Sequence, residues 1–516
     1  MSKFLITSNS ICMKKLFLTT LCLLASMLFS AKADVLNGLC GASGNNLQWS
    51  LDTKAGVLVI TGEGEMRDFE ARKSPWFGKR NSIKSVKLPE KLSSIGNYAF
   101  QELFKLTSVK LPQNLERIGD HAFEGCGKIT SVILPSKVNT LGDYVFKDCI
   151  ELNEIKFSPS IQRVEAYAFC NCKKLRSVIL PEQLVFIGSN AFFECSSLSS
   201  VQFPDGLEII GDYAFRKCSC LTSVTLPSSV REIHDRVFEG CDIFSLTIPE
   251  NTAATRNAFN GVKNIVYSGN NASAPWGAYH LNAYIEDDVM YQDASKSVVI
   301  ECKTSVVNVK LPNTVKKLEG YAFYNCKNLV SISISNGLTF IGKNCFAQCE
   351  NLSNIVIPES IESIEARAFE GCSKLSSVKL PNKKIELGGG IFAGCASLTE
   401  ISLPDSIKVI PNEFLAGTGL TSITIPESVT TIMDGAFEGS KLKDLHLPAN
   451  VKYISSLAFS CKSLKTITCD AVLPPQCRVW AFNKVDKAIS VYVPSESVRE
   501  YMAATGWEDF TNLQSK

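Results

Sequence analysis

A chain of 516 residues with 45% hydrophobic and 20% charged residues can bury a large core. Its 53 Lys and Arg are nearly balanced by 51 Asp and Glu, so it has no excess of positive charge to attract nucleic acid or an anionic membrane. Composition therefore argues against both partners.

The first 33 residues have the pattern of a signal peptide. They contain a basic start at 13–15, an apolar run at 16–30 and an Ala-x-Ala cleavage motif at 31–33. We predict cleavage after Ala33 and a mature chain that is secreted or held at the cell surface. Elsewhere no apolar segment approaches the roughly 20 residues that span a bilayer, so no membrane insertion is expected after signal removal.

Residues 34–82 are predicted to form an N-terminal cap. Within them, residues 45–64 alternate between polar and apolar side chains on both sides of the turn-forming segment 53–56. This pattern is typical of a β-hairpin, and a Pro75-Trp76 pair follows it.

From residue 83 the sequence repeats with a period of 23. The segment LTSVKLPQNLERIGDHAFEGCGK, residues 106–128, aligns without a gap with ITSVILPSKVNTLGDYVFKDCIE, residues 129–151. Eight units fill residues 83–264 and seven fill residues 306–463, a few of them shortened to 22 residues. A unit of 23 residues is too short to bury its apolar face alone. We therefore predict a solenoid whose units stack at a strand spacing of roughly 4.7–4.9 Å.

Three columns of the repeat predict its local structure. The fourth and sixth positions are apolar in every unit, as Val109 and Leu111 are, which indicates a short strand with one buried face. Proline follows in thirteen of the fifteen units and ends the strand, because it has no N–H to donate. A phenylalanine closes each unit and should stack on its neighbours: Phe100, Phe123, Phe146, Phe169, Phe192, Phe215, Phe238, Phe259, Phe323, Phe346, Phe369, Phe392, Phe414, Phe437 and Phe459.

The pattern L-x-S-V-x-L-P…I-G-x-x-A-F-x-x-C, present at residues 106–126, resembles the BspA-type leucine-rich repeat of bacterial surface and secreted proteins. The resemblance covers residues 83–463 outside the interruption, and the capping segments also resemble those of the family. It implies a β-rich repeat solenoid in an extracellular or cell-surface protein of the adhesin kind, whose repeats present an interaction surface.

Residues 265–305 interrupt the repeat. Residues 283–302 have the pattern of strand, turn and strand, with the turn at 293–297, which is the design of the N-terminal cap again. We interpret the segment as an island that joins the two arms of repeats and covers both of their cores.

Three alternatives for this island stay open, namely a degenerate repeat with a longer surface loop, a hinge and a ligand site. Aromatic side chains clustered on a loop often hold a carbohydrate or protein partner. The ligand site would use Trp276, Tyr279, Tyr284 and Tyr291.

Residues 464–516 are predicted to form a C-terminal cap with helix and strand. Ser495 has the position of an N-cap for a short helix that would place Val498, Tyr501 and Met502 on one face.

Ten of the twenty cysteines share one column, three residues after the phenylalanine: Cys126, Cys149, Cys172, Cys195, Cys218, Cys241, Cys326, Cys349, Cys372 and Cys395. Equivalent side chains of stacked coils point in parallel, which suits disulfide torsions poorly. Although exported proteins usually carry disulfides, we predict a buried ladder of reduced thiols, with Cys469 and Cys477 as the best-suited disulfide pair. No Cys-x2-Cys pair has a matching partner pair, so neither a metal nor another cofactor is predicted.

No catalytic motif is present. The four histidines lie in variable repeat positions or in the island and are predicted to be solvated surface residues: His121, His234, His280 and His446. A polysaccharide-degrading enzyme would need acids and bases gathered over a few neighbouring coils. Since the charges here are spread evenly, we predict a protein that is not an enzyme and keep such an enzyme only as a remote alternative.

The residue between the two buried strand positions points outward from the sheet in each unit. In the first arm this column includes Lys87, Lys110 and Lys156, which could form a mildly basic stripe. We predict a monomeric binding or adhesion module for an extracellular protein or glycan. Two alternatives stay open, namely a solvated sheet face that only avoids aggregation and an architectural spacer that presents another surface component.

Overall fold

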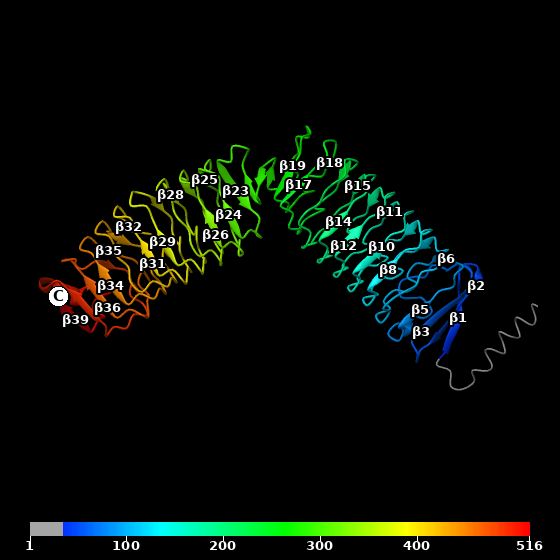
Figure 1. The fold of residues 1–516 in the computed structure, drawn as a ribbon. Coiled ribbons are helices and arrows are strands. Elements are labelled where there is room, and N and C mark those ends of the chain that lie inside the picture. The colour runs from blue at the N-terminus through cyan, green and yellow to red at the C-terminus, as the bar shows by residue number, and fades with distance from the viewer. Residues whose placement is uncertain (1–34) are drawn as a thin grey trace, which may run out of the picture. The chain divides into compact units, whose positions relative to one another are not determined.

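The computed structural model describes residues 35–516, so the predicted signal peptide lies outside the described residues. The described chain divides into two compact units, the first ending at Asn282 and the second spanning Ala283–Lys516. Each has its own hydrophobic core, the first ending at Ala278 and the second beginning at Val289. The predicted β-rich repeat solenoid is confirmed in both units (Figure 1).

In unit 1 most coils contain two short strands, a first and a second, which lie at opposite edges of the stack (Figure 1). The first strands are β5 (Ser85–Lys87), β8 (Ser131–Ile133), β10 (Glu154–Lys156), β12 (Ser177–Ile179), β14 (Ser200–Gln202), β17 (Ser245–Thr247) and β19 (Asn264–Val266). The second strands are β6 (Leu92–Ile95), β7 (Arg117–Ile118), β9 (Thr140–Leu141), β11 (Arg163–Val164), β13 (Phe186–Ile187), β15 (Ile209–Ile210), β16 (Glu232–Ile233) and β18 (Ala253–Ala254). The paired strands of neighbouring coils run parallel, and Ile133 pairs with Lys156, one period later.

The N-terminal end of unit 1 is an antiparallel meander. Its strands are β1 (Val35–Gly41), β2 (Gly44–Asp52) and β3 (Val57–Gly62), and β3 then pairs in parallel with β5. The short strand β4 (Gly64–Glu65) pairs with β6. A 3-10 turn, η1 (Phe77–Lys79), precedes the first repeat.

Unit 2 begins with another antiparallel meander, built from β21 (Tyr284–Glu286), β22 (Val289–Tyr291) and β23 (Val298–Cys302). Here β23 pairs with a second strand, β25 (Lys317–Leu318), whereas in unit 1 the meander joins a first strand. The island is therefore divided: β19 and β20 (His280–Leu281) add to the first-strand sheet of unit 1, and residues 283–302 start unit 2.

The coils of unit 2 follow the same plan. Its first strands are β24 (Asn308–Lys310), β26 (Ser331–Ser333), β29 (Ser377–Lys379), β31 (Glu400–Ser402), β34 (Asp444–Leu447), β36 (Thr466–Cys469), β38 (Ser490–Val493) and β39 (Asn512–Ser515). After β25, its second strands are β27 (Phe340–Ile341), β28 (Ser363–Ile364), β30 (Glu386–Leu387), β32 (Val409–Ile410), β33 (Thr431–Ile432), β35 (Tyr453–Ile454) and β37 (Gln476–Cys477).

A short helix, α2 (Val498–Ala503), covers the C-terminal end after the 3-10 turn η2 (Ser495–Ser497). Tyr501 is buried and its hydroxyl donates to the carbonyl oxygen of Ala471 at 2.7 Å. Two details of the prediction are wrong. Ser497, not Ser495, stands at the N-cap and makes no side-chain capping bond, and Met502 is exposed because only one side of so short a helix touches the core.

The phenylalanine column forms the centre of each core. Rings of most neighbouring coils stack, as Phe100 and Phe123 do with centroids 5.3 Å apart. The predicted stacking is wrong for Phe392 and Phe414, which meet edge to face with an interplanar angle of 78°. Trp76 stacks on the first of them, Phe100, at 5.9 Å and donates its indole N–H to the carbonyl oxygen of Ala99 at 2.7 Å. Trp276 lies at the other end of the unit 1 column, 6.0 Å from Phe259. Each tryptophan thus packs against the last phenylalanine at one end of the column, Trp76 in a stacked and Trp276 in a tilted arrangement.

Candidate interaction surface

The first-strand face of unit 1 carries a column of exposed side chains that runs from coil to coil. Lys87, Lys110 and Lys156 are exposed, and none of them has an ion-pair partner among residues 35–516. The bridge between Val86 and Val109 places Lys87 beside Lys110 in the column. These three ammonium groups are therefore free to meet an outside anion.

Two isoleucines interrupt the lysines. Ile133 is 65% exposed and Ile179 is 68% exposed. Ile133 lies directly beside Lys156 in the parallel pair of β8 and β10. The residue two positions earlier faces the same side, and it is serine in four of these five coils, with Glu154 as the exception. The column, which we call the lysine–isoleucine stripe (Lys87, Lys110, Ile133, Lys156, Ile179), offers both cationic and apolar contacts.

A second column on unit 1 is aromatic and was missed by the sequence analysis. Tyr98, His121, Tyr144 and Tyr167 stack with centroid distances of 4.5, 4.4 and 4.5 Å and interplanar angles of 9°, 7° and 5°. Each has a left-handed backbone, with φ between 54° and 58°, at the same place in its coil. Because the backbone is identical, the rings leave the coils in the same direction and stack face to face. The sequence pattern that could have predicted this column is the recurrence of tyrosine two residues before the phenylalanine of the repeat.

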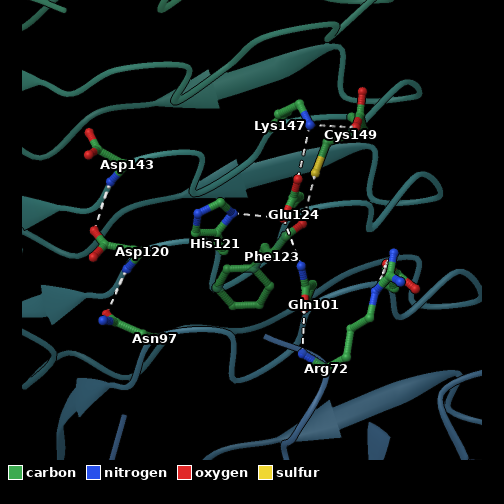
Figure 2. A network of polar contacts seen from close by, with 12 residues as sticks. Arg72, Asn97, Gln101, Asp120, His121, Phe123, Glu124, Asp143, Lys147 and Cys149 are labelled. Atoms are coloured by element: carbon green, nitrogen blue, oxygen red, sulfur yellow. Dashed lines mark hydrogen bonds and ion pairs between the residues drawn. The ribbon is translucent and has the colours of Figure 1, made fainter. Parts of the chain in front are cut away.

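A polar network supports this aromatic column (Figure 2). The carboxylate of Glu124 contacts His121 Nδ1 at 2.7 Å, and it accepts hydrogen bonds from Lys147 Nζ at 3.0 Å and Gln101 Nε2 at 2.8 Å. Burial alone would raise the pKa of Glu124, but the hydrogen bonds from His121, Lys147 and Gln101 lower that pKa to about 2. The carboxylate is thus held ionised and His121 is held in the stack.

A ladder of short polar side chains follows the same turns (Figure 2). Asn97 Oδ1 accepts the backbone N–H of Asp120 at 2.8 Å, and Asp120 Oδ1 accepts that of Asp143 at 2.9 Å. Asp143 continues the ladder to the N–H of Ala166 at 2.9 Å. These bonds satisfy backbone N–H groups that strand pairing leaves without a partner.

The aromatic residues of the island do not form the exposed cluster that the ligand-site alternative required. Trp276 is 1% exposed, and Tyr291 is also buried in the meander of unit 2. Only Tyr279 is largely exposed, at 65%, while Tyr284 is half-buried and lies 6.4 Å from Tyr291, centroid to centroid. Trp276 and Tyr291 are buried because each belongs to a hydrophobic core, Trp276 to that of unit 1 and Tyr291 to that of unit 2.

The cysteine column is buried, and all eighteen cysteines in the described chain are free thiols. Most of these thiols donate to the carbonyl oxygen of a phenylalanine in the preceding coil, as Cys172 does to Phe146 at 3.3 Å. The predicted disulfide between Cys469 and Cys477 is wrong. These residues lie in different sheets, and Cys469 Sγ lies 3.1 Å from the hydroxyl oxygen of Tyr501.

The histidines differ in environment. His446 and His234 are exposed or nearly so, and His280 is half-buried in β20. The prediction of a solvated surface residue is wrong for His121, whose side chain is 20% exposed between two tyrosines. Within residues 35–516 no group of three or more His, Cys, Asp or Glu side chains could hold a metal ion. The described part of the chain also has no helix with the length and apolar character of a membrane span.

Comparison with known families gives one match. The family model described as BspA type leucine rich repeat region matches residues 73–169, 140–266, 299–418 and 386–502. Together these segments cover most of the chain. Among curated proteins, none matches.

Several solved structures are similar to this chain. A leucine-rich repeat protein from Bacteroides ovatus is 21% identical over 69% of this chain and 92% of its own, with a TM-score of 0.34. A leucine-rich repeat protein from Eubacterium ventriosum is 20% identical over 79% of this chain and 95% of its own, with a TM-score of 0.33. A leucine rich cell surface protein from Faecalibacterium prausnitzii is 20% identical over 71% of this chain and 95% of its own, with a TM-score of 0.32.

Proposed function

Because the chain belongs to the BspA-type leucine-rich repeat family, we propose that it is an exported binding module that holds an extracellular protein or glycan on the first-strand face of unit 1. The observation that carries this proposal is the lysine–isoleucine stripe. Its lysines have no internal ion-pair partner, and its isoleucines expose apolar area that the core does not use.

The geometry favours an extended partner with anionic groups. Neighbouring stripe positions are one strand spacing apart, roughly 4.7–4.9 Å, so a chain-like ligand can contact several of them at once. The lysines would attract acidic side chains, uronates or sulfates, and the isoleucines would pack against apolar side chains or the carbon face of a sugar ring.

The test is binding of the purified protein to arrays of extracellular proteins and acidic glycans. The triple variant Lys87→Glu, Lys110→Glu, Lys156→Glu should lose binding at least about tenfold, since several ion pairs become repulsive contacts. A matched control exists in unit 2, where Lys310 and Lys379 are exposed at the same strand position. Lys310→Glu, Lys379→Glu should leave binding unchanged.

The two outcomes separate the proposed functions. Binding that survives the triple variant moves the site away from the stripe. If no protein or glycan on the arrays binds the folded protein, the architectural spacer becomes the better explanation.

A further inference from the structure

One coil of unit 2 departs from the repeat in its core. The preceding and following coils place Ile361 and Ile407 in a buried apolar column, but the equivalent residue between them is Lys384, which is exposed. In the preceding coil Ile361 donates its N–H to the carbonyl oxygen of Pro358 at 3.1 Å. Here Lys383 makes that bond, to Pro381 at 2.9 Å, so the turn closes one residue early and Lys384 leaves the core.

The second-strand sheet is interrupted at the same place. In neighbouring coils the residue after the second strand donates its N–H to the coil before, as Gly388 does to Ile364 at 2.9 Å and Met433 does to Ile410 at 3.0 Å. Pro411 occupies this position in the intervening coil and has no N–H to give. One sheet accordingly ends at β30 and the next begins at β32.

These departures open a pocket of about 660 Å³ between the two coils. Its apolar wall includes Ile385, Leu387, Ile407, Val409 and Met433. Ile385 and Leu387 are only half-buried, and Val409 is 44% exposed. The volume and the apolar lining fall within the range of small-molecule sites.

The charges that line the pocket are all positive. Lys384 and Lys408 contribute to the lining, and no Asp or Glu does. Neither lysine has an ion-pair partner within residues 35–516. Two carboxylates of the surrounding coils are engaged elsewhere: Asp405 accepts from the side-chain amide of Asn382 at 2.8 Å, and Glu413 pairs with Arg367 at 3.1 Å.

We propose that this pocket binds a small amphipathic anion, a molecule with an apolar body and one carboxylate, sulfonate or sulfate group. The apolar body would cover Leu387, Val409 and Met433, and the anionic group would lie between Lys384 and Lys408. This site is independent of the stripe on unit 1, and neither proposal depends on the other.

Two dyes of matched shape test the site: anilinonaphthalene sulfonate, which carries one negative charge, and uncharged N-phenylnaphthylamine. Fluorescence titration of the purified protein should show saturable binding of both dyes, with the anion bound more tightly. Lys408→Gln should weaken binding of the anionic dye about fivefold, because one exposed ion pair is lost. Binding of the neutral dye should be unchanged. Lys384→Leu should fill the pocket, restore the apolar column and remove binding of both dyes.

Two further variants complete the test. Val409→Glu changes an exposed position, so it should fold normally and reduce binding of the anionic dye more than tenfold by like-charge repulsion. Lys379→Gln removes an exposed lysine outside the pocket and should leave the binding of both dyes unchanged. The proposal is overturned if neither dye binds saturably, or if Lys384→Leu and Val409→Glu, both folded by circular dichroism, bind the anionic dye as the parent does.

Discussion

The Sγ of Cys126 donates a hydrogen bond to the backbone carbonyl oxygen of Phe100 in the preceding coil, at 3.1 Å. The same bond recurs down both units, for example from Cys195 to Phe169 and from Cys395 to Phe369, each at 3.2 Å. Each thiol is therefore a small core side chain that also satisfies a buried acceptor.

This arrangement predicts which thiols react. With iodoacetamide at pH 8, native protein should be alkylated at Cys220, the exposed cysteine, while Cys126 and Cys395 should react only after unfolding. Burial excludes the reagent and raises the pKa of both buried thiols to about 12, so the reactive thiolate is absent. Peptide mapping by mass spectrometry measures the sites. Alkylation of Cys126 in native protein as fast as that of Cys220 would contradict the buried ladder.

The same thiols predict a loss of stability at alkaline pH. The pKa of Cys126 rises from 9.0 to about 12 on folding, so its contribution is complete below pH 9 and declines as the pH rises toward 12. Between pH 9 and pH 12 the free energy of unfolding should therefore fall less steeply with pH in the Cys126→Val variant than in the parent protein. The difference in slope should be about 1.4 kcal/mol per pH unit. Urea unfolding at pH 8 and pH 10 provides the measurement. Equal pH slopes for the two proteins would show that Cys126 ionises alike in both states.

Glu124→Gln should change stability in the opposite pH range. The pKa of Glu124 is lowered from 4.5 to about 2, so its ionised form stabilises the folded state above pH 4.5 and this contribution is lost as the pH falls toward 2. We expect the variant to be less stable by about 2 kcal/mol at pH 6 and nearly equal to the parent at pH 2. Urea midpoints at the two pH values test this. Glu194→Gln, at a more exposed ion pair with Lys217, is the control and should have a smaller effect.

Trp276, the tryptophan of the island, should contribute to the stability of the fold and not to ligand binding. Trp276→Ala removes a fully buried ring that packs against Tyr267 at 4.8 Å and Phe259 at 6.0 Å, and we expect a loss of about 3–5 kcal/mol. Tyr279→Ala removes an exposed ring three residues later and should cost less than about 0.5 kcal/mol. Chemical denaturation compares the two variants. Similar small losses in both would restore Trp276 as a candidate for ligand contact.

The two units should fold separately. Because the two hydrophobic cores share no residue, fragments 35–282 and 283–516 should each show β-rich circular dichroism and a cooperative thermal transition. A cut within a core, giving 35–188 and 189–516, is the control and should expose apolar surface that binds a hydrophobic dye. An unfolded 283–516 fragment would mean that unit 2 depends on unit 1.

The sequence predicts the fold because neighbouring coils repeat the same contacts. The spacing of 23 residues between Phe100 and Phe123 is enough to infer that their rings stack. The prediction fails where the spacing changes. Trp276 follows Phe259 by only 17 residues, so no alignment of the repeats places it in the phenylalanine column. The Pro-Trp pair that it shares with Trp76 was the available signal, since both tryptophans pack against an end of the phenylalanine column.

The candidate site is predicted less completely, because exposure and contact depend on the path of each turn. Lys87, Lys110 and Lys156 were found from strand alternation alone, which fixes the side of the sheet. The stacking of His121 depends on a left-handed backbone that no sequence pattern of single histidines reveals. The pocket beside Lys384 arises from a turn that closes one residue early. The available signal was a lysine at a position that is isoleucine in the preceding and following coils.

Residues that pair between coils differ by one repeat length, as Ile133 and Lys156 or Ile179 and Gln202 do. Within a regular run of repeats, every contact between neighbouring coils is therefore equivalent to the next one. A recombination event that removes or duplicates residues 129–151 joins coil edges that already fit, and both ends of the unit keep their caps. The number of coils, and with it the number of contact positions available to a partner, can thus change in inheritance without any redesign of the core.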